Sequence, residues 1–369
     1  MASKVYFTDF RTGLGTSLTV KLQKLIRQAG IGTIDFDNKF VAIKMHFGEL
    51  GNLAYLRPNY AKAVADVIKE NGGLPFLTDC NTLYPGSRKN ALEHLDCANI
   101  NGFNTVTTGC QIIIADGLRG TDDIIVPVPN GECCKEAYIG RAVMDADIFI
   151  SLTHFKGHEQ AGFGGAIKNI GMGCGSRAGK MQQHQSGHPH VITDMCRGCR
   201  RCAKECGSNA IRYEDNKAYI DPDLCKGCGR CIGACAFDAI ENDNWDAPQM
   251  LGKRMAEYTA AVISGRPSFH ISLITDVSPN CDCHGENDAR SFPISECWLL
   301  SIRSRSIRPA STCARRRNLS GTASSATTWQ IRTSTITATT GITATPTYPG
   351  QRRSNMPRRS ASVQGNMNL

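Results

Sequence analysis

The sequence predicts a mainly parallel, doubly wound α/β sheet, interrupted by a cysteine-rich insert and followed by a disordered basic tail. Three observations lead to this prediction. Apolar strand-like runs alternate with helix-like runs over residues 1–190 and resume at 242–289. Residues 191–241 hold a repeated run of cysteines, and residues 290–369 show no sustained periodicity. Strands that alternate with helices are typical of parallel sheets covered by helices on both faces.

The elements of the α/β part have local signals. Gly30 can terminate the first helix, Pro58 suits the first helical position of the second, and the apolar run from Lys39 is typical of a buried parallel strand. Strands are predicted at residues 4–8, 39–48, 74–80, 111–116, 147–158 and from 268 onward. Helices are predicted at residues 17–30, 58–73, 87–103, 133–146 and 247–264.

The insert contains the spacing C-x-x-C-x-x-C-x-x-x-C twice, at a period of 29 residues. Three thiolates at positions i, i+3 and i+6 of a tight loop can reach three irons of one cubane. In bacterial two-cluster ferredoxins, the fourth cysteine of each run ligates the other cluster. The spacing therefore predicts a ferredoxin-like module with two 4Fe-4S clusters. Their ligands would be Cys196, Cys199, Cys202 and Cys235 for the first, and Cys225, Cys228, Cys231 and Cys206 for the second.

Other uses of these cysteines fit less well. Zinc ribbons use two C-x-x-C pairs separated by a longer span. Disulfides need an oxidising compartment, and no signal peptide opens the chain, so we expect a reducing cytoplasm. The proline that usually follows the fourth cysteine is replaced by Gly207 and Ala236, which loosens a turn but removes no ligand.

The charge of the chain is unevenly distributed. The net charge is +9, but residues 290–369 carry 12 arginines and one acid, a net of +11, which leaves −2 for the rest. A nucleic-acid partner is therefore not expected, and no apolar run is long enough to span a bilayer. Basic residues around the cysteine loops are either a solvated face or a docking surface for a soluble, acidic redox partner. They are Arg197, Arg200, Arg201, Lys204, Lys226 and Arg230.

The composition of residues 290–369 suggests a second hypothesis besides disorder. The segment has no lysine and is dense in Ser, Thr and Arg. Back-translating it with permitted codons and shifting the register restores acidic residues and amphipathic patterns over about eighty residues, including GMLASFDPVAIDQA. We therefore hypothesise a frameshift, which resequencing the gene near the codons for 289–292 would test.

Candidate catalytic residues lie at the ends of the predicted strands, where parallel sheets bind ligands. His46 follows the second strand, and His154 and His158 end the fifth, next to a Gly-rich stretch that contains Lys168. Backbone amides of such a stretch can cradle an anion, and histidine can transfer protons. Further histidines in this irregular segment are His184, His188 and His190. Cys281 and Cys283 offer soft ligands but cannot complete a metal site alone, and the remaining cysteines are interpreted as small buried residues.

These motifs resemble a known family. The stretch FKGHEQAGFGGAIKNIGMGCGSRAGKM, the inserted double cysteine motif and DVSPNCDCHG are similar to the domain-of-unknown-function family 362 in its ferredoxin-containing form. The resemblance covers residues 4–289 and implies the cofactor and the architecture, but not a reaction. HEQAGFGGAIK is also similar to the His-containing loop of nickel-pincer lactate racemases, which implies a proton-transferring role for His158.

Together these features predict an iron–sulfur oxidoreductase, or a component of one, that passes electrons to a site on the α/β domain. The site residues would be His158, Lys168, His154 and His46, acting on an unknown small molecule. Two alternatives stay open. One is a racemase-like proton-transfer enzyme with structural or sensory clusters, and the other is a plain electron carrier.

Overall fold

A computed structural model of the chain describes residues 4–84, 86–158, 160–184, 189–225, 227–242, 248–286, 297–302 and 327–329. Residues 1–331 form one compact unit, and residues 332–369, which form a second, lie outside the described residues.

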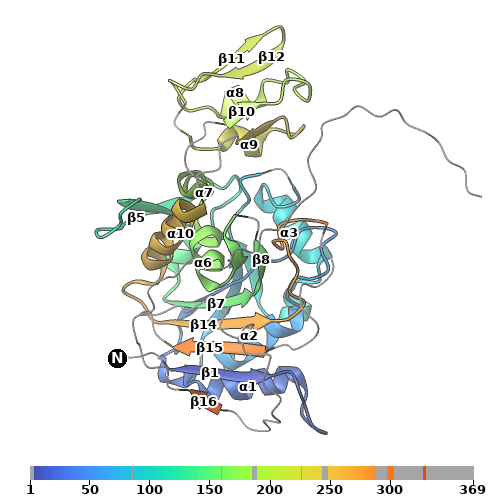
Figure 1. Cartoon of the computed structure of the whole chain (residues 1–369), viewed down its shortest axis with the longest axis vertical. Coiled ribbons are helices and arrows are strands. Elements are labelled where there is room, and N and C mark those ends of the chain that lie inside the picture. Colours follow the sequence, from blue (N-terminus) through green and yellow to red (C-terminus); the bar gives the residue numbers. More distant parts are fainter. Residues whose placement is uncertain are drawn as a thin grey trace, which may run out of the picture. The chain divides into compact units, whose positions relative to one another are not determined.

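The unit is built on an eight-stranded mixed sheet (Figure 1). Its strand order is β16-β1-β15-β14-β7-β2-β3-β4, and the five strands from β14 to β4 are parallel. The antiparallel strand β15 lies between β14 and β1. The bounds are β1 Val5–Asp9, β2 Phe40–Lys44, β3 Leu74–Asp79, β4 Gln111–Ile114, β7 Ile148–His154, β14 Ser268–Ile274, β15 Cys297–Ile302 and β16 Thr327–Trp329.

Helices cover both faces of this sheet, because alternate residues of its buried strands point to opposite sides. Val41 and Ile43 pack with helices α1 (Leu18–Gln28) and α2 (Pro58–Glu70), whereas Ala42 packs with α6 (Ala166–Cys174) and α10 (Pro248–Ile263). Ser17 caps α1 by accepting a hydrogen bond from the Val20 amide, and Pro58 begins α2 as its sequence predicts. The predicted α/β architecture with a parallel sheet is confirmed.

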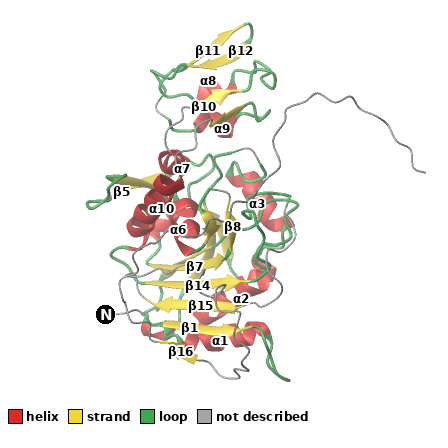
Figure 2. Ribbon diagram, in the orientation of Figure 1, coloured by secondary structure: helices red, strands yellow, loops and turns green. Residues whose placement is uncertain are grey.

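Smaller elements surround the sheet (Figure 2). They are α3 Ala91–Ile100, α4 Thr105–Thr108, β5 Asp123–Pro127, β6 Glu136–Gly140, α5 Arg141–Asp145, β8 Lys156–His158, β9 Gly162–Gly164, α7 Arg177–His184 and the 3₁₀ helix η1 Ile31–Thr33. One prediction was wrong here. The helix expected over 133–146 is strand β6 followed by the short helix α5, because residues 136–140 pair antiparallel with β5.

The cysteine-rich insert repeats its backbone as well as its sequence. Its elements are β10 Pro189–Val191, α8 Arg201–Glu205, β11 Ile211–Glu214, β12 Lys217–Ile220, α9 Arg230–Ala234 and β13 Ile240–Asn242. Strand β10 pairs with β13, and β11 pairs with β12. Three pairs of residues 29 positions apart share a left-handed backbone: Gly198 and Gly227, Arg200 and Gly229, and Asn209 and Asp238.

Most of the segment expected to be a disordered tail lies outside the described residues, as does the hypothesised frameshift. Two of its pieces, β15 and β16, are strands. The composition of the tail did not predict them, since strand β15 is defined by its pairing with β1 and β14, which are far away in the sequence. Within the described residues, no helix is long and apolar enough to cross a membrane.

Candidate functional site

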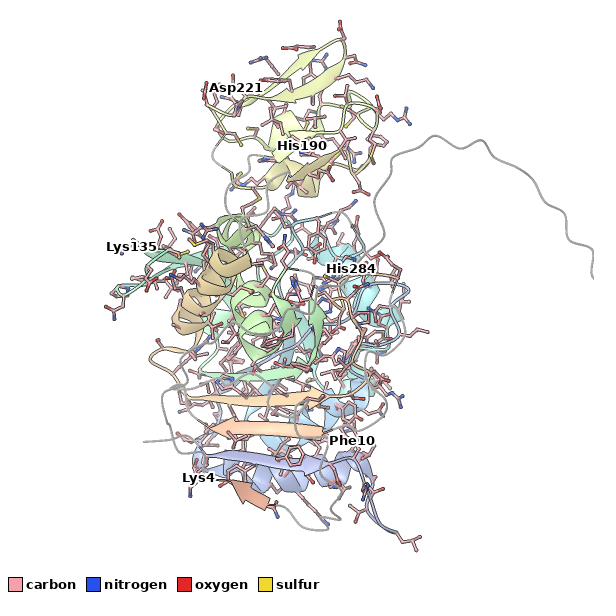
Figure 3. The ribbon with its side chains drawn as sticks, in the orientation of Figure 1. Lys4, Phe10, Lys135, His190, Asp221 and His284 are labelled. Atoms are coloured by element: carbon pink, nitrogen blue, oxygen red, sulfur yellow. The ribbon has the colours of Figure 1, made fainter. Side chains whose placement is uncertain are left out.

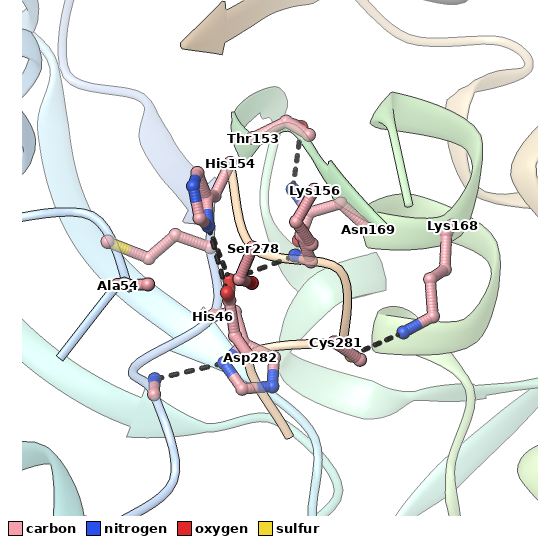
Figure 4. A network of polar contacts seen from close by, with 12 residues as sticks. His46, Ala54, Thr153, His154, Lys156, Lys168, Asn169, Ser278, Cys281 and Asp282 are labelled. Carbon is pink, nitrogen blue, oxygen red and sulfur yellow. Dashed lines mark hydrogen bonds and ion pairs between the residues drawn. The ribbon is translucent and has the colours of Figure 1, made fainter. Parts of the chain in front are cut away.

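The carboxyl ends of β2, β3 and β7 and the turn that follows β14 meet in a buried, charged region (Figure 4). Asp282 is fully buried there, with His154 Nδ1 2.9 Å from both its oxygens and Lys156 Nζ 3.0 Å from Oδ2. Burial alone would raise the pKa of Asp282, but His154 and Lys156 hold it well below its usual range. His154 Nε2 lies 2.7 Å from the carbonyl oxygen of Thr275. Both ring nitrogens are thus engaged, which favours an anchoring role for His154 over acid–base chemistry.

Two cysteines flank Asp282. The Lys168 ammonium lies 2.8 Å from Cys281 Sγ. A hydrogen bond from the Cys283 thiol and the ammonium of Lys168 lower the pKa of Cys281 despite its burial. The same hydrogen bond raises the pKa of Cys283, and burial together with the contact to Cys283 raises that of Tyr84. Tyr84, Cys283, Cys281 and Lys168 therefore form a continuous polar chain that ends in a stabilised thiolate.

Tyr84, Cys283 and Lys168 of this chain line two cavities. One has a volume of about 500 Å³ and includes His158, His184, Lys180 and Met255 in its walls. The other, of about 50 Å³, includes Lys44, His46, Arg88 and Lys156. The two share Tyr84, Met172, Lys168, Lys180 and Cys283.

His158 ends β8 at the wall of the larger cavity. Its Nδ1 accepts hydrogen bonds from the amides of Gln160 and Ala161, at 3.2 and 3.1 Å. Burial and the ammonium groups of Lys168 and Lys156 lower the pKa of His158 to about 2. The ring is therefore neutral at physiological pH and carries its hydrogen on Nε2, so it is suited to donating a hydrogen bond rather than to acting as a strong base.

His46 is held among donors at the end of β2. The Gly48 amide donates to Nδ1 at 2.9 Å, and Arg88 Nη1 lies 3.0 Å from Nε2. Burial and Arg88 lower the pKa of His46. Arg88 in turn donates from Nε to Glu49 Oε2 at 2.9 Å.

The cations in the cavity walls are not all matched by acids. Lys44 lies 3.0 Å from Asp79, and both are almost completely buried. Lys156 is paired with Asp282 and Arg88 with Glu49. Lys180 Nζ, by contrast, donates to the neutral carbonyl of Gly175 at 2.6 Å. Since buried charges are normally paired, Lys180 suits an anionic group at the place that the two cavities share, although Glu49 and Glu286 also line the larger one.

The eight predicted ligands of the insert form two groups. Cys196, Cys199, Cys202 and Cys235 line one small cavity. Cys225 lies close to Cys228 and to Cys206, and Cys231 close to Cys228 and Cys225. The fourth cysteine of each run therefore lies with the other run.

Backbone amides point at these sulfurs in the same way in both halves. The Ala210 amide donates to Cys206 Sγ and the Ala239 amide to Cys235 Sγ, both at 3.2 Å. Hydrogen bonds to sulfur are one means by which proteins tune iron–sulfur clusters, so this donor set fits such a group. Within the described residues, no three Cys, His, Asp or Glu side chains converge on a single metal ion. The four thiolates of a cubane bind four different irons and therefore stand farther apart than the ligands of one ion.

The insert packs directly on the charged region through Leu83 and Tyr84, which follow β3. Leu83 belongs to the same apolar cluster as Cys202, Cys231 and Cys235, with Tyr84 packed against it. A side chain at Gly229, in the second cysteine loop, would come within 3.0 Å of Leu83. The same two residues, Leu83 and Tyr84, line the large cavity.

The structure brings most of the sequence-predicted residues together but not all of them. His158, Lys168 and His46 line the cavities, with His154 behind them. His190 lies in β10 of the insert, 3.6 Å from Glu241, whereas His284 belongs to the turn after β14 (Figure 3). His188 lies outside the described residues.

Sequence reasoning missed the roles of Tyr84, Arg88 and Asp282. The spacing of Cys281 and Cys283 was the available signal for the thiol pair. The two cysteines were expected on a polar loop, and they belong to a turn in which the His284 amide donates to the Cys281 carbonyl at 3.1 Å.

Comparison with protein families gives one clear result. The family model described as "Domain of unknown function (DUF362)" matches residues 41–300, which is more than half of the chain. The chain belongs to the DUF362 family. None of the curated proteins compared with this DUF362 protein matches it.

Two solved structures are similar to it at 13% identity. One is the lactate racemase apoprotein from Thermoanaerobacterium thermosaccharolyticum, with a TM-score of 0.34 over 71% of this chain and 46% of that one. The other is a structural-genomics protein from Thermotoga maritima, with a TM-score of 0.35 over 69% of this chain and 50% of that one. The chain thus spans about half the length of each.

Proposed function

We propose that this protein is an iron–sulfur electron-transfer protein, a redox enzyme or a component of one, that delivers electrons to the cavity at the strand ends. Two 4Fe-4S clusters, held by the eight cysteines of the insert, would supply one-electron steps. The main support is the shared position of Leu83 and Tyr84. They pack with the cysteine loops on one side and line the cavity on the other.

The residues of the cavity would bind and orient an anionic substrate. Lys180 and Lys168 place positive charge in the wall, and neutral His158 can donate a hydrogen bond from Nε2. Lys156 and His154 hold Asp282, and through it the turn with the two cysteines, in place. Hydrogen bonds around the insert sulfurs and the burial of Cys196, Cys202 and Cys235 would set the redox potentials.

A basic cleft beside the insert fits an acidic redox partner. It has a volume of about 430 Å³ and is lined by Lys89, Arg119, Arg201, Lys204 and Arg230, with Glu205 as its only acid among the described residues. Arg201, Lys204 and Arg230 are exposed. Complementary charge accelerates association in a salt-dependent manner. The reduction rate by an acidic electron carrier should therefore fall as salt is added, and more steeply in wild type than in the R201E/K204E variant.

The test of the proposed function starts with anaerobic iron and sulfide quantitation and EPR of the dithionite-reduced full chain. Two spin-coupled clusters are expected, and C231S should lose one of them. The matched control is C133S, which changes a half-buried cysteine outside the insert. One cluster or none in the wild type contradicts the proposal. If variants of the cavity residues leave the reoxidation rate of the clusters unchanged during turnover, the protein is a plain carrier.

A proton-transfer enzyme is the second candidate, since His158 and Lys168 line the same cavity. It predicts that H158A abolishes exchange of solvent protons into the substrate while the cluster spectra stay intact. A redox enzyme predicts instead that substrate turnover stops in C231S and in the other cluster-cysteine variants.

A further inference from the structure

Cys281 differs from the other buried cysteines of the α/β part. Burial raises the pKa of Cys80 and Cys174, and Cys80 donates its thiol hydrogen to the Cys174 carbonyl at 3.4 Å. These are ordinary neutral thiols. Cys281 is equally buried, at 1% exposure, but its sulfur lies 2.8 Å from the Lys168 ammonium. A buried ammonium at this distance stabilises a thiolate, the nucleophilic form of cysteine.

Cys283 is the neighbour of this thiolate and also a wall of both cavities. The Cys283 thiol donates a hydrogen bond to Cys281 and accepts one from the Tyr84 hydroxyl. The hydrogen bond places the two sulfurs side by side in one turn.

The turn that carries the pair is fixed on several sides. Asp282 is held by its carboxylate and also accepts the Glu49 amide at its carbonyl, at 3.0 Å. Asn52 Nδ2 donates to the His284 carbonyl at 2.9 Å. The backbone of the turn is therefore held in place, with the sulfur of Cys281 beside Lys168 and that of Cys283 beside Tyr84.

We propose that Cys281 and Cys283 form a reversible disulfide that turns the one-electron steps of the clusters into two-electron chemistry on a disulfide substrate in the large cavity. This inference rests on the proposed function for its electron source. Tyr84 links the two parts, because it contacts Cys283 and packs against the apolar cluster of the insert.

The reduction step balances as follows for the protein. The Cys281–Cys283 bond breaks as the pair takes up one proton and two electrons, which two reduced clusters held by the insert cysteines would supply one each. Cys281 becomes the thiolate paired with Lys168, and Cys283 becomes the thiol. A small disulfide that enters the cavity then re-forms the Cys281–Cys283 bond by thiol–disulfide exchange. The cysteine pair loses one proton in this exchange. The substrate leaves as one thiol and one thiolate, and the thiolate takes up a proton from solvent.

The state of the pair can be measured in one peptide. Trypsin releases residues 255–290, in which Cys281 and Cys283 are the only cysteines. The anaerobic full chain is equilibrated with mixtures of reduced and oxidised dithiothreitol, and finally with diamide, then alkylated under denaturing conditions and digested. The peptide should change from two alkyl groups to none in a single step. It should do so equally in C133S, whereas C283S should keep one reactive thiol or a mixed disulfide.

Two alkyl groups at every setting, diamide included, would overturn the proposal, as would a mixed disulfide on one cysteine with the other alkylated in the wild type.

Electron transfer from the clusters to the cysteine pair is tested by photoreducing the clusters of the diamide-oxidised, desalted protein. Two thiols should then appear in the peptide as the clusters reoxidise. A disulfide that forms but survives cluster reduction contradicts the electron path, and hence the proposed function. If the clusters pass their electrons to another acceptor while the Cys281–Cys283 disulfide never forms, only the inference about the cysteine pair is contradicted.

Discussion

The substitution D282N tests the anchor of the site. It keeps the shape of the side chain but removes the charge that His154 and Lys156 contact at 2.9 and 3.0 Å. At 3.0 Å and an effective dielectric constant of about 20, the attraction of one such pair is about 5 kcal/mol. Desolvation offsets much of this, and breaking a buried ion pair typically costs about 3–5 kcal/mol. We expect D282N to lower the free energy of unfolding by about 3–5 kcal/mol.

The assay is guanidinium denaturation followed by circular dichroism, with clusters kept intact under anaerobic conditions. With an m-value of about 4 kcal/mol/M, the midpoint should fall by about 1 M. The matched control is D35N, because the charge of Asp35 makes an exposed (i, i+4) pair with Lys39 at 3.1 Å and its loss should leave the midpoint unchanged. Asparagine keeps the side-chain oxygen that accepts from the Asp37 amide at 3.3 Å. Equal midpoints for D282N and D35N would refute the reasoning.

The pH dependence gives this prediction a second arm. The pKa of folded Asp282 is depressed, so its stabilising contribution is complete above the unfolded carboxyl pKa of about 3.9 and is lost as the pH falls further, toward the folded value. The difference between wild type and D282N should thus be constant from pH 5 to 8 and shrink only in acid. A difference that already shrinks between pH 7 and 5 would assign the effect to another group.

Three further predictions concern single residues. C235S should remove roughly half of the iron and spare the second cluster, since Cys235 lies with the first three cysteines; metal analysis and EPR check this. K168Q removes the ammonium beside Cys281, so the pKa of the thiolate should rise and oxidation of the pair by oxidised dithiothreitol should slow at pH 7, with its pH profile moved upward. Burial raises the pKa of Asp116 to about 6. Its favourable contribution to the free energy of unfolding is therefore present at low pH and is lost as the pH rises through that value. D116N should therefore gain stability relative to wild type between pH 4 and 7, and a flat difference would contradict this.

The sequence by itself determined the features that depend on neighbours along the chain. Strand and helix periods predicted the parallel sheet, because a buried strand such as Phe40–Lys44 and an amphipathic helix such as Leu18–Gln28 are defined within a few residues. The cysteine repeat predicts two clusters with four thiolates each, which iron analysis tests. Its period reappears in the left-handed residues of both halves, such as Gly198 and Gly227.

Only the tertiary structure decided which side chains meet. Lys168 and Cys281 are 113 residues apart, and His154 and Asp282 are 128 apart, so no local pattern links them. The parallel register of β7 and β14 brings their ends together, and the turn after β14 then places Cys283 at the cavity and Cys281 beside Lys168. The helix expected over 133–146 failed for the same reason, since pairing with β5 outweighed local helix preference.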